Sequence, residues 1–160
     1  MSKRTVVAAI VGFVGGLLVV VGTALPWLSI TASGDPSSSG FSGDQSLNGL
    51  SGVMGILLIP LGVIIMVAAV WLWAGSDGRK MTGLLGASGI TAVALAATVL
   101  LTKADALGLG FGYPEEHMSV EIGVYVMIGA GVLAIVAAIL AALPARTAGG
   151  VVGNAPGASV

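Results

Sequence analysis

Residues 5–28, TVVAAIVGFVGGLLVVVGTALPWL, decide the fold of this chain. The stretch contains no ionisable residue, and at about 1.5 Å of rise per residue a helix of this length crosses the ~30 Å hydrocarbon core of a bilayer. A helix is expected because a lone apolar segment in lipid must satisfy its own N–H and C=O groups, and the alternation of a barrel strand is missing. A signal peptide is the alternative, since Lys3 and Arg4 precede the run, but the run is too long and the small-residue cleavage pattern is poor.

The rest of the chain repeats this pattern. Hydrophobic residues make up 56% of it and charged residues only 8%, whereas soluble domains carry about 25% charged residues. Three further segments lack ionisable residues, at 50–74, 81–102 and 122–143. We therefore predict an all-α membrane protein with four transmembrane helices in an up-down bundle over residues 1–144, followed by a Gly/Ala-rich cytoplasmic tail over 145–160.

The basic residues predict the orientation of these helices. All but one of the 6 Lys and Arg residues fall on one side of the predicted membrane, the exception being Lys103. The positive-inside rule then places both termini and the link at 75–80 in the cytoplasm. We expect a multi-pass protein of the cell (inner) membrane.

Three tryptophans stand near the ends of predicted helices. Trp27 closes the first apolar run, and Trp71 and Trp73 close the second. Indoles favour the headgroup level of a bilayer, so these residues are predicted interface anchors. Pro26 ends or bends the first helix, and the turn-forming residues that follow predict a flexible outer loop over 31–48.

Small residues recur at helical spacing in all four segments. They let helix backbones approach closely, which favours association in lipid, where burial replaces no water. Contact within the bundle is the main interpretation, and a face kept for another protein is the alternative. Pro60, in the second segment, is either a static kink or a hinge. The predicted packing residues are Gly12, Gly16, Gly55, Gly62, Gly83, Ala87, Ala130, Ala134 and Ala138.

The second outer loop, residues 103–121, differs in kind from the first. It spaces large apolar side chains between glycines, and we predict that Phe111 and Tyr113 contact a partner. The segments SLNGLSGVMGILLIPLG and MSVEIGVYVMIGAG, which open the second and fourth helices, also resemble each other weakly. This similarity suggests two parallel helical-hairpin repeats.

The chain carries no motif for chemistry. It has no Cys and a single His, so thiolate nucleophiles and Cys-based metal sites are excluded. His117 and Glu121 would share one face of a helix that began at Pro114, but one imidazole with acids is a poor metal site by ligand count. Proline and acidic residues also suit a helix N-terminus, which explains the pattern better. We expect no catalysis, cofactor, metal or nucleic-acid partner.

The predicted membrane segments lack the residues that several classes of membrane protein need. Proton-coupled carriers and intramembrane enzymes usually hold an ionisable residue inside the membrane, and none of the four segments has one. In LPWLS at 25–29 and EIGVYVMIGAG at 121–131, the chain resembles a broad set of uncharacterised small four-helix membrane proteins of actinobacteria, over residues 5–143. The resemblance implies no activity.

We predict a non-catalytic accessory or assembly subunit of a larger membrane complex, such as a lipid or solute transporter or a respiratory assembly. Its expected partners are membrane lipids and other integral membrane subunits. The alternative is a self-assembling channel or an uncoupled small-molecule carrier, for which a polar stripe along one helix would be evidence. The third segment holds a partial one, Thr91, Thr98 and Thr102.

Overall fold

The computed structural model describes residues 3–30, 45–51, 53–75, 78–102 and 118–143. Within these ranges, four helices are long and apolar enough to cross a membrane. Their bounds lie within about four residues of the predicted ones. The helices are α1 (Lys3–Ala24), α3 (Val53–Trp73), α4 (Gly78–Thr102) and α5 (Ile122–Ala142).

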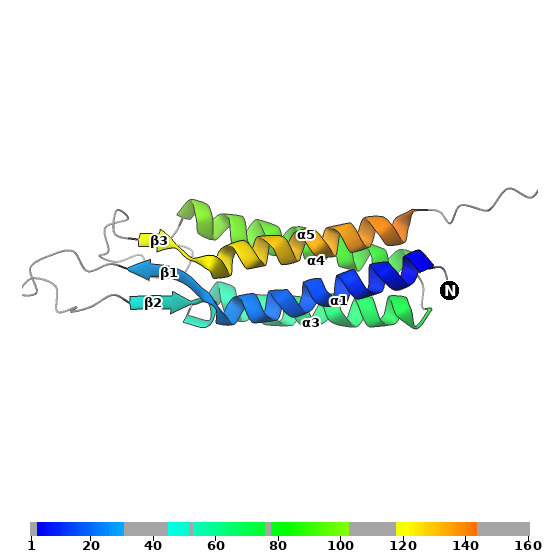
Figure 1. Cartoon of the computed structure of the whole chain (residues 1–160), viewed down its shortest axis with the longest axis horizontal. Helices are drawn as coiled ribbons and strands as arrows, with labels where there is room; N and C mark the ends of the chain where they lie inside the picture. The colour runs from blue at the N-terminus through cyan, green and yellow to red at the C-terminus, as the bar shows by residue number, and fades with distance from the viewer. Residues whose placement is uncertain (1–2, 31–44, 52, 76–77, 103–117, 144–160) are drawn as a thin grey trace, which may run out of the picture.

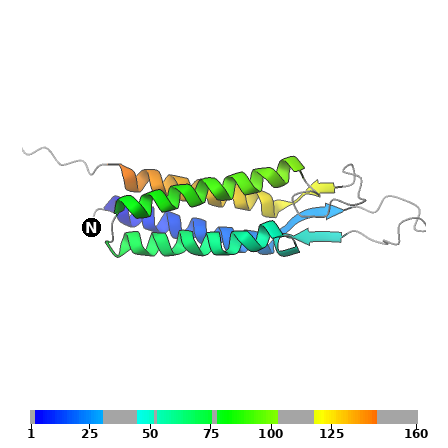
Figure 2. The same ribbon diagram turned by 180° about the vertical axis from the view of Figure 1, so that it is seen from behind.

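The four described helices lie side by side along the long axis of the molecule (Figure 1). α1 contacts both α3 and α5, and α5 contacts α4, while α3 and α4 contact each other less extensively than these three pairs. The start of α1 and the end of α5 lie at one end of the helices, and the strands lie at the other. The view from behind brings α3 and α4 to the front (Figure 2).

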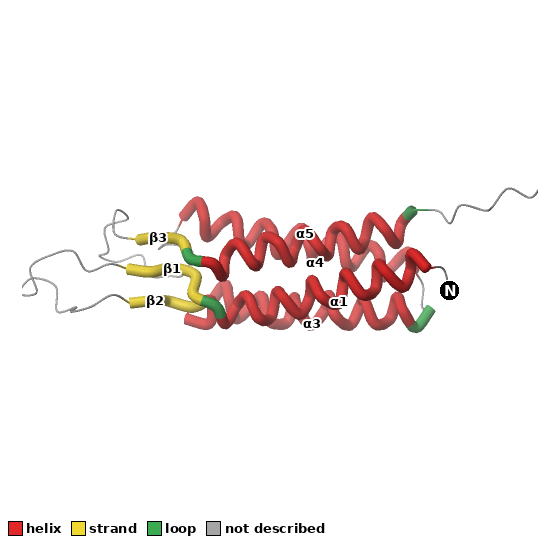
Figure 3. Tube along the Cα trace, in the orientation of Figure 1, coloured by secondary structure: helices red, strands yellow, loops and turns green. Residues whose placement is uncertain are grey.

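The described chain is mostly helical, as predicted, but a small sheet that was not predicted lies at one end of the helices (Figure 3). Its central strand β1 (Pro26–Ile30) pairs antiparallel with both β2 (Gln45–Asn48) and β3 (Met118–Val120). The predicted flexible loop was therefore wrong at its C-terminal end, where residues 45–48 form β2. A short 3₁₀ turn, η1 (Gly49–Ser51), then leads into α3.

The sheet also sets where α5 begins. Residues 118–120 are paired with β1, so α5 begins at Ile122, as predicted, and no helix runs from His117 to Glu121 to bring their side chains to one face. Glu121 is extended, with φ −99° and ψ 175°, and occupies the N-cap position of α5. Its backbone N–H donates to the carbonyl oxygen of Trp27 at 2.8 Å, which carries the β1–β3 pairing up to the first turn of the helix.

The core runs through the middle of the helices and up to the sheet. Its largest fully buried side chains include Trp27, Leu58, Ile65, Leu85 and Met127. Among the described residues, the only buried polar side chains are Thr23 and Ser88. Many large aliphatic side chains face outward instead, as expected where the surrounding solvent is lipid. α3 continues through Pro60 without a break.

Candidate functional site

Trp27 is completely buried and joins the sheet to the helices. Its indole Nε1–H donates to the carbonyl oxygen of Gly22 at 2.8 Å. In a continuing helix that carbonyl would accept from the N–H of residue 26, but Pro26 has no N–H. The indole N–H therefore replaces the missing backbone donor of Pro26 at the end of α1.

Two glycines from other elements make room for this ring. A Cβ on Gly49 would lie 2.5 Å from Cε2 of Trp27, and a Cβ on Gly123 would lie 2.5 Å from Cδ1. Both distances are too short for any side chain, so only glycine fits at either position. Since Gly49 precedes α3 and Gly123 opens α5, the ring connects the ends of three helices that lie next to the sheet.

The structure thus gives Trp27 a packing role that differs from the predicted exposed anchor. Its ring has no surface left for lipid headgroups. Trp71 and Trp73, near the end of α3, are 54% and 62% exposed. Their rings are available to headgroups, and their anchoring role stays a prediction.

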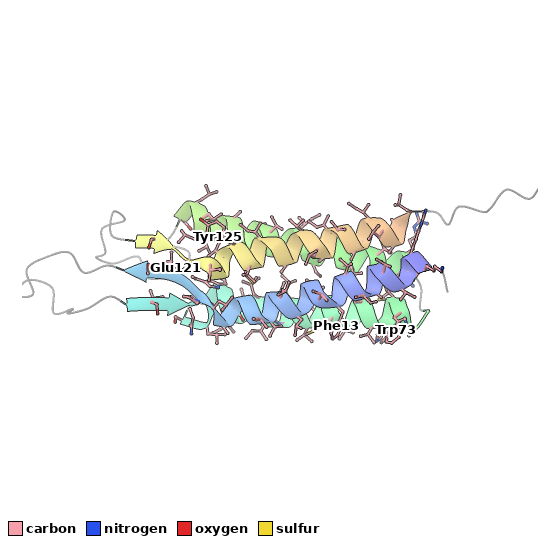
Figure 4. The ribbon with its side chains drawn as sticks, viewed as in Figure 1. Phe13, Trp73, Glu121 and Tyr125 are labelled. Atoms are coloured by element: carbon pink, nitrogen blue, oxygen red, sulfur yellow. The ribbon has the colours of Figure 1, made fainter. Side chains whose placement is uncertain are left out.

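A chain of polar contacts ties β1 to β3. The Ser29 hydroxyl donates to Oε1 of Glu121 at 2.7 Å and lies 2.6 Å from the Ser119 hydroxyl. Because Ser29 has one proton to give, Ser119 must donate to Ser29. Figure 4 shows Glu121 where β3 passes into α5, with Tyr125 one turn further on. These three side chains fix the register of the two strands.

Removing the middle hydroxyl should loosen this pairing. We expect Ser29→Ala to destabilise the β1–β3 contact by about 1 kcal/mol, because a partly exposed hydrogen bond to a carboxylate is lost. Hydrogen exchange of the Glu121 amide, which bonds to Trp27, measures the effect. The matched control is Ser51→Ala, which removes a hydroxyl bonded to Asn48 at the same end of the molecule. Equal exchange in the two variants would refute the assignment.

Helix backbones approach each other closely where pairs of glycines from two helices face each other. A Cβ on Gly16 would lie 2.8 Å from the carbonyl oxygen of Gly62, and a Cβ on Gly62 would lie 2.9 Å from that of Gly16. α4 and α5 meet in the same way, with 2.8 Å from a Cβ on Gly89 to the oxygen of Gly131 and 2.9 Å in the reverse direction. Each pair brings two helices into backbone contact, a geometry that suits Cα–H···O interactions.

The other predicted packing residues divide into three groups. Gly12, Ala130, Ala134 and Ala138 are buried between helices. Gly55 is also buried, but a Cβ there would overlap the backbone of Gly49, so it packs on the turn before its own helix. Gly83 and Ala87 are exposed and take no part in packing within the helices. The prediction did not include Gly89 and Gly131, which form the α4–α5 crossing.

The exposed pair on α4 belongs to a longer stripe of small residues. Gly83, Ala87 and Thr91 follow one another at intervals of four and are all exposed. A Cβ on Gly83 would meet nothing within 4 Å. This face has the spacing of a helix-packing surface without a neighbour among the described residues.

The predicted partner-contact residues Phe111 and Tyr113 lie outside the described residues, as do His117 and the tail at 145–160. Their roles stay predictions. No protein-family model, no curated protein and no solved structure matches this chain, so its function has to be inferred from its own residues.

Proposed function

We propose that this chain is a multi-pass protein of the cell (inner) membrane that acts by contact, as an accessory or assembly subunit of a larger membrane complex. The host would be a lipid or solute transporter or a respiratory assembly. The observation that carries the proposal is the exposed stripe of Gly83, Ala87 and Thr91 on α4. Because these side chains are small, a helix of another subunit can approach this face closely.

The interior of the molecule favours this proposal over a channel formed by one chain. The described core is apolar, and the hydroxyl of buried Thr23 donates to Val20 of its own helix. The threonines of the partial stripe on α4 also bond to their own helix, Thr91 to Ala87 and Thr98 to Ala94, each at 2.9 Å. Each of these hydroxyl protons is therefore used within its own helix.

The stripe can be tested with one bulky side chain. Gly83→Leu should abolish recovery of partner proteins when the tagged chain is extracted in mild detergent, because a leucine would hold the neighbouring helix away from α4. The fold should be unaffected, since a Cβ at Gly83 meets nothing within 4 Å. Thermal stability in detergent reports on the fold separately.

Gly129→Leu is the matched control for this experiment. Gly129 is also an exposed helical glycine with nothing within 4 Å, but it lies on α5. Its neighbours one turn away, Tyr125 and Val132, are large. Equal loss of partners in both variants, or full recovery in both, would remove the support for the α4 stripe. Phe111→Ala combined with Tyr113→Ala tests the outer-loop contact in the same assay.

The proposed topology is an up-down bundle of two helical hairpins with both termini in the cytoplasm. Two observations support it. The basic residues cluster on one side of the helices, and the glycines of α3 and α5 that contact a neighbouring helix occupy matching positions. Gly62 and Gly131 each lie nine residues after the first residue of their helix, Val53 in α3 and Ile122 in α5.

A reporter fused after Val160 tests this orientation. We expect activity only from a reporter that works in the cytoplasm, because Lys and Arg near the helix ends hold their loops on that side. A fusion at residue 40, in the first outer loop, is the control and should give the opposite result. A C-terminal fusion active only outside the cytoplasm would reverse the topology.

A further inference from the structure

An apolar groove of about 280 Å³ runs along the outer side of α1 and α3. α1 lines it from Val6 to Val14, and α3 lines it with Ala69, Val70 and Trp73. Figure 4 shows Phe13 near the middle of α1 and Trp73 close to the end where α1 begins, both on this side of the molecule. Every lining side chain is apolar except for the indole N–H of Trp73.

Small residues make the floor of the groove and large ones make its walls. Ala9 and Ala69 are buried, whereas Ile10, Phe13 and Trp73 stand out from the helices. A Cβ on Gly12 would lie 3.3 Å from that of Ala69, so α1 and α3 nearly touch beneath the opening. The groove follows the helices for about 12 Å at 1.5 Å per residue. Its volume is roughly twice that of a ~150 Å³ cavity that takes up benzene. These dimensions suit a segment of one acyl chain.

Two of the described basic residues lie near the ends of α1 and α3 at which Val6 and Trp73 line the groove. Lys3 lies one turn before Val6, and Arg79 is the second residue of α4, after Gly78, where a Cβ would lie 4.0 Å from Leu72 near the end of α3. Both basic side chains are exposed. Among the described residues the only carboxylate side chain is that of Glu121, at the opposite end (Figure 4).

We infer that this groove binds one acyl chain of an anionic phospholipid, whose phosphate lies between Lys3 and Arg79. The tail fills the apolar cleft in the membrane, and the indole N–H of Trp73 faces the headgroup level. A basic cluster beside an apolar site favours anionic over zwitterionic headgroups. The inference goes beyond the proposed function and needs no protein partner.

Quenching of tryptophan fluorescence by brominated acyl chains tests the site. The Trp71→Phe variant, which keeps Trp73 and the buried Trp27, is reconstituted in phosphatidylcholine vesicles containing a minor fraction of brominated phosphatidylglycerol. Quenching of Trp73 by brominated phosphatidylglycerol should exceed its quenching by the same fraction of brominated phosphatidylcholine. Each basic residue near the membrane surface attracts an anionic headgroup. We therefore expect phosphatidylglycerol to be preferred over phosphatidylcholine by about fivefold for each of Lys3 and Arg79 that contacts the phosphate.

Two comparisons decide the outcome. The Trp73→Phe variant keeps Trp71, which is exposed near the same end of α3 but does not line the groove, and should show no preference. Lys3→Gln with Arg79→Gln should abolish the preference at Trp73. Equal preference at both tryptophans, preference that survives the double charge change, or protection of Trp73 from both lipids would each overturn the inference. Protection would mean that protein, such as a second copy, covers the groove.

Discussion

Trp27→Ala is expected to lower the free energy of unfolding in detergent by about 3–5 kcal/mol, the usual cost of truncating a buried tryptophan to alanine. The side chain is fully buried and held between Gly49 and Gly123. Its loss would leave a cavity where three helices meet the sheet, and the carbonyl of Gly22 without a donor. Equilibrium denaturation in mixed detergent measures the change.

Two further variants separate the causes. Trp27→Phe keeps most of the packing but removes the Nε1–H, so about 1–3 kcal/mol should be lost through the unsatisfied carbonyl. Trp73→Ala removes the same side chain from an exposed position and should change stability by less than about 0.5 kcal/mol. If Trp27→Ala were as mild as Trp73→Ala, the ring would not hold the helices and sheet together.

Gly16→Leu is expected to destabilise the protein by about 3 kcal/mol, at the upper end of the usual cost of overpacking. A Cβ at this position would lie 2.8 Å from the carbonyl oxygen of Gly62 and 2.9 Å from the backbone nitrogen of Met66. Backbone atoms cannot turn aside as a flexible side chain would, so the two helices must separate. Thermal unfolding in detergent measures the loss.

The same measurement on Gly129→Leu provides the control. That position is open, and leucine has the higher helix propensity, so stability should be unchanged or slightly raised. Ala134→Leu, buried where α5 meets Gly15, should behave like Gly16→Leu. Unchanged stability in both core variants would mean that these small residues do not hold the helices together.

The four helices could be predicted because each carries its own signal. Length and freedom from charge are properties of one segment, and they require no knowledge of its neighbours. The sheet carries no comparable signal. Its strands have three to five residues, too few to show a period, and the central strand pairs with residues far along the chain.

The roles of single residues were harder to predict, because one residue type serves two environments. A tryptophan at a helix end suits a headgroup layer, but it also suits a space between two glycines. For Trp27 the two are distinguished by Gly49 and Gly123, which lie far from it in the sequence. On α4, small residues occur on two sides of the helix. Spacing alone could not tell that Gly89 faces α5 while Gly83 faces outward.

The pairing of β1 with β3 also has a consequence for how the protein is made. Ser29 and Ser119, which lie opposite each other, are 90 residues apart. A ribosome adding about 5–20 residues per second needs roughly 5–18 s to cover that distance. During this interval the finished first half waits with one edge of β1 bare and one side of Trp27 uncovered, and a bare strand edge invites wrong partners. Until β3 and α5 have been synthesised, β1 can therefore mispair with other strands.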